Sequence, residues 1–109
     1  MSADGGGLNL DSSQETFEGM MPYRGPISPP APGLVQWAYS LVVEGLDHSV
    51  PFAVTLVDSK GIQVASGQSE EGVASIEAEL REQSYELGIE GAQPIAFRAI
   101  CSQTYGYRG

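Results

Sequence analysis

The stretch from residue 51 to residue 90, PFAVTLVDSKGIQVASGQSEEGVASIEAELREQSYELGIE, decides the fold class. Near its start, Phe52, Val54 and Leu56 alternate with smaller or more polar residues. This two-residue period is that of a β-strand with one buried face. The tetrapeptide DSKG at residues 58–61 then predicts a turn, because Asp bonds the backbone ahead of it and Gly accepts a positive φ. The stretch therefore reads as short strands separated by turns.

One segment of the same stretch, residues 73–81, is ambiguous. Its residues alternate in polarity as in a strand, but Val73, Ile76 and Leu80 would also line one side of a helix, and Ala, Glu, Leu and Arg are good helix formers. A helix of this length would be marginal in isolation, and both neighbouring segments read clearly as strands. We therefore expect a strand here.

The strand pattern continues on both sides of this stretch. Upstream, Val35, Trp37, Tyr39, Leu41 and Val43 share one face of an extended segment that begins at residue 34. Downstream, residues 95–101 form a final strand, and residues 103–109 are expected to be an exposed end or an edge-strand continuation. Turns that recur about every eight to twelve residues predict an all-β fold, a single antiparallel Greek-key β-sandwich of about six to seven strands over residues 34–109.

Residues 1–33 differ in composition from the rest of the chain. They begin with a glycine triplet and end in a proline-rich run, so we expect a flexible arm that does not fold on its own. The plain interpretation is a solvated leader or linker. The alternative is that its scattered apolar residues become ordered on a partner or on the domain's own flank. These candidate anchors are Leu8, Leu10, Phe17, Met20, Met21 and Tyr23.

The charge of the chain restricts its partners. Five basic residues against fourteen acidic ones leave a formal net charge of −9 at pH 7. Such a surface repels phosphates and anionic lipid headgroups, so neither nucleic acid nor membrane is an expected partner. The first residues lack the positive region and apolar run of a secretory signal. We expect a cytoplasmic protein, unless a dedicated machine exports it or it is incorporated into a particle.

Residues suited to catalysis are sparse. His48 is the only histidine and Cys101 the only cysteine, which leaves no nucleophile with a base at a recognisable spacing and no thiolate cage for zinc. We expect His48 in a surface loop and Cys101 as a buried, inert thiol. The acidic residues fall on turns or outward strand positions, where carboxylates are normally solvated. The sequence predicts no catalytic residue, no cofactor and no metal site.

Residues 39–90 resemble the small transthyretin-like or carboxypeptidase-regulatory-like β-sandwich modules, particularly those appended to type VI secretion spike proteins. The resemblance rests on Pro51 and Phe52 leading a V-x-L strand, on the turn at residues 58–61, and on the glycine-bracketed turn at residues 67–72. It implies a non-catalytic adaptor that docks a protein cargo or a neighbouring subunit of a secretion-spike or contractile-injection-type assembly.

Three hypotheses for function follow. The first is this adaptor, which would use the first or last strand of the sandwich as a pairing edge and the N-terminal arm as a second contact. The second is a structural or decoration component of a phage or phage-like particle, and so of a larger oligomeric assembly. The third is a small carboxylate-based hydrolase. The candidate partner-binding residues are Phe17, Met20, Met21, Tyr23, Phe97 and Ile100.

Overall fold

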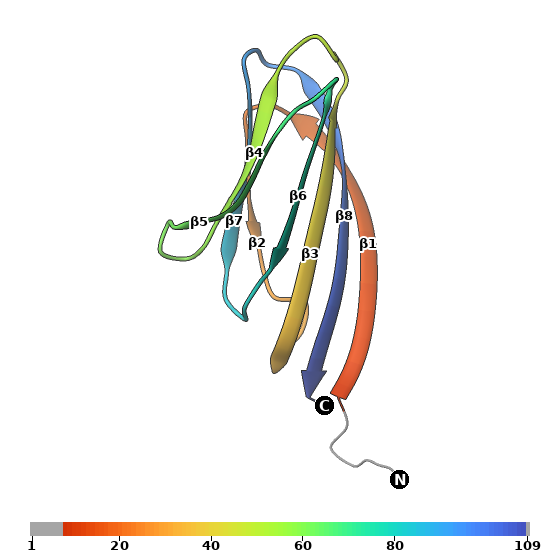
Figure 1. Cartoon of the computed structure of the whole chain (residues 1–109), viewed down its shortest axis with the longest axis vertical. Helices are drawn as coiled ribbons and strands as arrows, with labels where there is room; N and C mark the ends of the chain where they lie inside the picture. Colours follow the sequence, from red (N-terminus) through yellow and green to blue (C-terminus); the bar gives the residue numbers. More distant parts are fainter. Residues whose placement is uncertain (1–7, 109) are drawn as a thin grey trace.

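The computed structural model describes residues 8–108, which form eight strands and no helix (Figure 1). The strands stack as two antiparallel layers of four. Their bounds are β1 Leu8–Met20, β2 Tyr23–Ile27, β3 Leu34–Gly45, β4 Phe52–Val57, β5 Gln63–Gln68, β6 Val73–Glu79, β7 Tyr85–Gly91 and β8 Ala96–Arg108.

The strand order is that of a jelly roll. One layer, here the β1 sheet, has the order β1-β8-β3-β6, and the other, the β2 sheet, has the order β2-β7-β4-β5. Eight strands in two such layers are the two interlocked Greek keys of this architecture. The predicted all-β Greek-key sandwich is confirmed, with eight strands rather than six or seven. The ambiguous segment at residues 73–81 is a strand, β6, as expected.

The structure differs from the sequence expectation at residues 8–27. These residues were expected in a flexible arm, but they form β1 and β2. β1 has few apolar residues, and its order comes from pairing with β8 in an unbroken register from Leu8↔Arg108 to Met20↔Ala96. That partner lies at the other end of the sequence, so local composition does not reveal it. Residues 1–7 of the expected arm lie outside the described residues.

The identity of the edge strands also differs from the prediction. The first strand expected for the sandwich corresponds to β3 and the last to β8, and both are internal strands of the β1 sheet. β8 pairs with β1 on one side and with β3 on the other. Residues 103–108 are therefore neither an exposed end nor an edge, because they continue β8 through to Arg108, and residue 109 lies outside the described residues. The prediction that the first or last strand is a free edge is wrong.

The core lies between the two sheets and is built from alternate residues of each strand. Trp37 is fully buried, and its indole Nε1 donates a hydrogen bond to Gln103 Oε1 at 2.6 Å. The expectation that Val35 shares this buried face is wrong, because an irregularity in the β3–β8 register between Leu34 and Gln36 leaves Val35 exposed. The other largest fully buried side chains are Phe97, Met21, Leu41, Leu56, Leu87, Ile89, Val43 and Val54.

One side of the sandwich is closed by β5 and β6, which succeed one another in sequence and cross from one sheet to the other (Figure 1). The turn between them is held by the bridge Glu70↔Val73 and has positive φ at Glu71 and Gly72. Within β5, Gly67 lies so close to β6 that a Cβ atom there would overlap the carbonyl oxygen of Ser75. This close approach brings the two sheets together along their β5–β6 side.

We predict that Gly67→Ala lowers the free energy of unfolding by about 2 kcal/mol, because the added methyl group must push backbone apart. Gly88→Ala in β7 is the matched control, since a Cβ there meets only Thr55 Oγ1 at 3.4 Å. Replacing this strand glycine should be neutral or stabilising by about 0.5 kcal/mol. Urea unfolding of both variants measures the difference, and equal effects would show that β5 and β6 are not closely packed.

Candidate protein interface on β1 and the open side of the sandwich

The outer edge of β1 is the longest edge of the described sandwich. β1 has thirteen residues, against a usual strand length of about five to six. All thirteen pair with β8 on one side, and no described strand pairs with the other side. The strand contains no proline and no lysine, which are common means of protecting an edge. The backbone N–H and C=O groups on its free side can therefore accept another strand.

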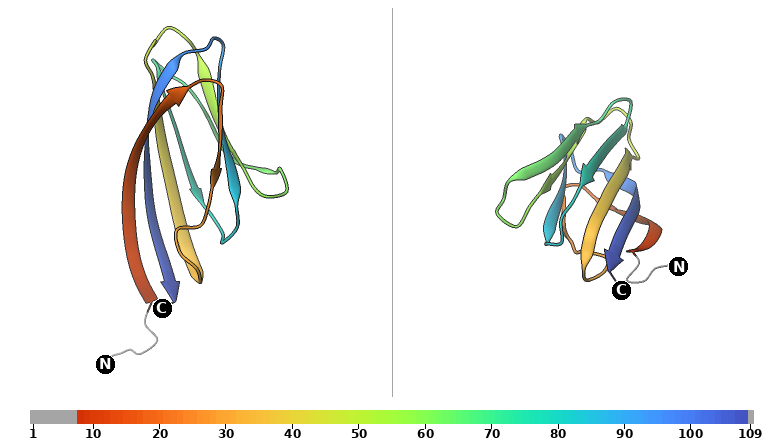
Figure 2. Two further views of the ribbon diagram at one scale, coloured as in Figure 1. Left: turned by 180° about the vertical axis from the view of Figure 1, so that it is seen from behind. Right: turned by 60° about the horizontal axis from the view of Figure 1, so that its bottom comes forward.

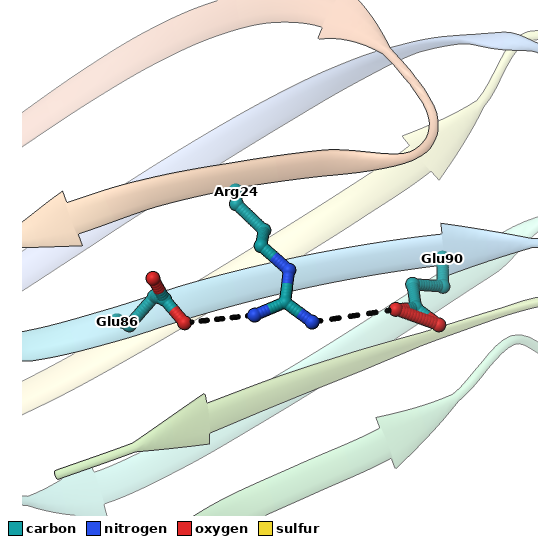
Figure 3. Close-up of polar contacts among 3 residues, drawn as sticks. All are labelled: Arg24, Glu86 and Glu90. Carbon is teal, nitrogen blue, oxygen red and sulfur yellow. Dashed lines mark hydrogen bonds and ion pairs between the residues drawn. The ribbon is translucent and has the colours of Figure 1, made fainter. Parts of the chain in front are cut away.

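The other three edges of the two sheets are protected. β2 has only five residues and contains Pro26, which lacks a backbone donor. The side chain of Arg24 on β2 reaches across to β7, with 3.0 Å from Nη1 to Glu86 Oε1 and 3.9 Å from Nη2 to Glu90 Oε1 (Figure 3). These exposed ion pairs add little stability. β5 and β6 are short, and they lie against one another on the closed side of the sandwich.

The outward-facing residues of β1 include three exposed apolar side chains. Leu8, Leu10 and Met20 are 46%, 65% and 57% exposed. They lie at the two ends of the strand, with polar residues between them. Near the Met20 end of β1, Glu18 Oε2 accepts a hydrogen bond from Arg98 Nε at 3.2 Å. β1 therefore offers an unpaired backbone edge and, beside it, apolar surface that a partner could cover.

The face of the β1 sheet that points away from the core carries mostly small side chains. Ala38, Ser40, Ser102 and Thr104 line a shallow depression of about 450 Å³. Glu77 and Glu79 contribute to its lining from β6. This surface is wide and open, and so it is suited to contact with another protein surface rather than to enclosing a small substrate.

On the side opposite β5 and β6, the two sheets are less tightly joined. β1 and β2 follow one another in sequence but belong to different sheets. Between them lies a cleft of about 250 Å³. It is lined by Glu15, Phe17, Tyr23, Pro26, Ile27, Ser28, Tyr39, Leu87, Cys101 and Gln103.

A buried hydroxyl group without an oxygen or nitrogen partner lies at this cleft. Tyr39 is only 2% exposed, and its hydroxyl group makes no hydrogen bond with such an atom among the described residues. Its neighbour is the Cys101 thiol, which is a weak partner. Burial, assisted by Cys101, raises the pKa of Tyr39 far above its ordinary value.

Cys101 lies on β8 and is 8% exposed, as expected for a buried thiol. Burial raises the pKa of Cys101, against an opposing contribution from Tyr39, so the thiol is neutral at pH 7. The only histidine, His48, lies between β3 and β4, where Nε2 is 3.1 Å from Glu44 Oε2 and the ring is exposed. Cys101 is thus not arranged as an activated nucleophile.

The structure separates the six predicted partner-binding residues into three groups. Phe17, Tyr23 and Phe97 form an aromatic cluster with ring centroids 5.5–6.0 Å apart. Phe97 is fully buried in it, and Met21 is also buried in the core, so neither is accessible to a partner in this fold. Phe17 and Tyr23 are partly buried against the core, as in the alternative in which the arm orders on the domain's own flank. Only Met20 and Ile100 have side chains open to solvent.

Sequence reasoning missed the two features that distinguish this side of the molecule, the free edge of β1 and the unpaired Tyr39 hydroxyl. The alternation of β1 is masked because polar residues occupy most positions on both of its faces. Among residues 8–108, no three His, Cys, Asp or Glu side chains are grouped so that they could hold a metal ion. Nor does any of these residues lie in a helix long and apolar enough to cross a membrane.

Comparison with known proteins supports the fold. The chain is similar to a solved structure of Bacillus endospore appendages, which are described as a family of disulfide-linked pili, with a TM-score of 0.65 and 12% identity over 98% of this chain and 97% of that one. At this identity the likeness establishes a shared fold. No model of a known protein family matches the chain, and no curated protein matches it.

Two further solved structures superpose more loosely. The CBM22-1–GH10 modules of xylanase 10B from Clostridium thermocellum give a TM-score of 0.41 and 18% identity over 71% of this chain and 17% of that one. The P-domain of Macrobrachium rosenbergii nodavirus gives a TM-score of 0.36 and 13% identity over 94% of this chain and 93% of that one. Superpositions this loose say nothing of a shared function.

The unpaired Tyr39 hydroxyl leads to a prediction. Tyr39→Phe should raise the free energy of unfolding by about 1 kcal/mol, because it removes a buried polar group that lacks a good partner. Tyr85→Phe is the matched control, since the Tyr85 hydroxyl accepts a hydrogen bond from the Arg81 backbone N–H at 2.8 Å. Tyr85→Phe should therefore lower the free energy of unfolding by about 1 kcal/mol. Urea titrations compare the two, and a loss of stability in Tyr39→Phe would mean that its hydroxyl has a partner.

The same residue predicts a dependence on alkaline pH. Because the pKa of Tyr39 is raised in the folded state, the unfolded chain loses this proton first, and stability falls as the pH rises above the unfolded value of about 10. Below that pH Tyr39 is protonated in both states, and its contribution to the free energy of unfolding is fully present. Unfolding curves between neutral and strongly alkaline pH should show a smaller loss for Tyr39→Phe than for the wild type. An equal loss would place the alkaline sensitivity elsewhere.

Proposed function

We propose that this chain is a non-catalytic structural subunit that joins other protein subunits through the free edge of β1 in a larger oligomeric or particle-type assembly. The observation that carries the proposal is the thirteen-residue β1 strand with one unpaired side. An exposed edge of this length is a template for strand addition, in which main-chain hydrogen bonds provide affinity and side chains provide register. Met20 at one end of β1, and Leu8 and Leu10 at the other end, add apolar surface to be covered.

The chemistry of the described residues supports a role without catalysis. The one thiol is buried and neutral at pH 7, the one histidine is paired with a surface carboxylate, and the described residues contain no metal-ligand group. The larger depression is open and lined by small side chains. Such a surface is suited to contact with another protein. The fold shared with the endospore appendage protein shows that a jelly roll of this size can serve in a pilus.

Assembly of this chain would depend on non-covalent contacts. Its only cysteine, Cys101, is buried on β8, so a covalent link of the kind named for the endospore appendages is not accessible in the folded subunit. A free, buried thiol also suits a protein that is made and kept in a reducing compartment. We therefore propose a subunit that is made in the cytoplasm and is either incorporated into a particle there or exported by a dedicated machine.

An adaptor of the transthyretin-like, secretion-spike kind is the alternative. It would use the same free edge, but it would stay monomeric until a cargo protein arrived. The oligomeric behaviour of the purified chain therefore separates the two hypotheses.

We expect the purified chain to self-associate as its concentration rises. The formal net charge of −9 opposes association over long distances, so added salt should shift the equilibrium toward the assembled form. Sedimentation velocity over a range of concentrations, at low and high salt, measures this shift, and negative-stain images of natively expressed material should show repeated copies. A chain that remains monomeric throughout, and occurs singly beside an unrelated cargo, would contradict the structural role and favour the adaptor.

A further inference from the structure

We infer that β1 pairs with β1 of a second copy of this chain, antiparallel and about a two-fold axis that passes through Gln14. This inference rests on the proposed structural role and specifies its partner and register. It would join two β1 sheets into one continuous sheet with the order β6-β3-β8-β1-β1-β8-β3-β6, in which neither β1 edge remains free.

The symmetry of a strand pair limits the possible registers. In an antiparallel pair, side chains directly opposite one another point to the same face of the sheet. When the two strands are identical and related by a two-fold axis, one residue must therefore lie opposite its own copy. Gln14 is the central residue of β1, with six residues of the strand on each side, so an axis at Gln14 pairs the whole strand.

Charge distinguishes this register from its neighbours. An axis at Ser13 would place Asp11 opposite Glu15, and an axis at Glu15 would place that carboxylate opposite its own copy. Like charges directly opposite one another destabilise a strand pair. An axis one step further, at Ser12 or Thr16, avoids these contacts but leaves four residues of β1 without a partner within the strand.

With the axis at Gln14, no acidic residue of β1 faces another. Asp11 lies opposite Phe17, Glu15 opposite Ser13, and Glu18 opposite Leu10. Among the registers that keep like charges from lying directly opposite one another, this one pairs β1 along its entire length, although the chain as a whole is strongly acidic.

The exposed apolar residues of β1 fit the same register. Leu8 and Met20, which are 46% and 57% exposed, come directly opposite one another at both ends of the pair. Both belong to the face that points away from the core, because their β8 partners, Arg108 and Ala96, alternate with the buried positions of that strand. Pairing therefore covers apolar surface that an isolated subunit leaves in water, at two symmetric places.

The shape of the subunit also permits this arrangement. In the views of Figures 1 and 2, the ends of β1 and β8 near the chain termini project past the β2 sheet, whereas the other end of β1 is backed by it. An axis at Gln14 sets the projecting end of each copy beside the backed end of the other. The two β2 sheets then lie at opposite ends of the joined strands and do not compete for the same space.

Position-specific disulfide formation tests the register. In a Cys101→Ala background, Gln14→Cys should form a covalent dimer under mild oxidation, because residues directly opposite have Cα atoms about 4.5–5.5 Å apart. Ser12→Cys and Thr16→Cys are matched controls on the same exposed face. Each lies four residues, about 14 Å, from its own copy, which is beyond the limit of about 7 Å for a disulfide. Neither control should dimerise alone, but an equimolar mixture of the two should give the mixed dimer.

A charge exchange tests the same contact without cysteine. Gln14→Asp and Gln14→Lys each place like charges on the axis, so each homodimer should weaken by about tenfold. Mixing the two variants should restore a dimer that contains one copy of each. Sedimentation of each variant and of the mixture measures this effect, and circular dichroism of each variant verifies that the sandwich is intact.

The outcomes separate this inference from the proposed function. Assembly of the wild type with equal cross-linking at residues 12, 14 and 16, or with no effect of charge at residue 14, would overturn the β1–β1 register and leave the structural role standing. A wild type that is monomeric at every concentration and salt would overturn both. Cross-linking at Gln14→Cys alone, together with the mixed Ser12→Cys and Thr16→Cys dimer, is the result that the inference requires.

Discussion

The antiparallel pairing of β1 with β8 is the interaction on which the rest of the structure depends. It satisfies one side of β1 and makes β8 an internal strand, held by β3 on its other side. Without β1, the long backbone of β8 would have an open edge, and the turn that brings Met21 into the core would have no strand to start from. A segment that is mostly polar thus becomes ordered through its backbone, since each main-chain donor and acceptor paired with β8 no longer needs water.

The two sides of the sandwich are built differently, and only the side formed by β1 and β2 is open to a partner. On the closed side, Gly67 permits β5 to approach β6 at backbone distance, and no edge of useful length remains. On the other side, β1 and β2 belong to separate sheets, an aromatic cluster fills much of the space between them, and a cleft remains beside the Tyr39 hydroxyl. The molecule is therefore stabilised on one side and open to a partner on the other. The proposed contact with another protein subunit uses this open side.

The proposed β1–β1 pair would allow an acidic protein to associate with itself. The net charge of the whole chain opposes association, but the stability of the strand pair depends mainly on the charges that lie directly opposite one another. Along β1 the three acidic residues are spaced so that no two of them lie directly opposite one another in full-length pairing. Long-range repulsion would then limit association in dilute, low-salt solution, while short-range complementarity would set its geometry.

The sequence by itself determined the class of fold and most of the core. Alternation in residues 52–57 and 85–91 is a local property, and it predicts which side chains lie inside because a strand has only two faces. It also predicted that Cys101 is buried and that His48 lies exposed in a loop. Among the predicted contact residues, Met20 and Ile100 are exposed, whereas Met21 and Phe97 are buried, because exposure depends on what packs over a residue.

Only the tertiary structure decided that residues 8–20 are a strand, that β8 and β3 are internal, and that β1 is the free edge. The physical reason is that strand pairing is made between backbones far apart in the sequence. The pairing partner of a polar strand leaves no periodic trace in the strand's own residues.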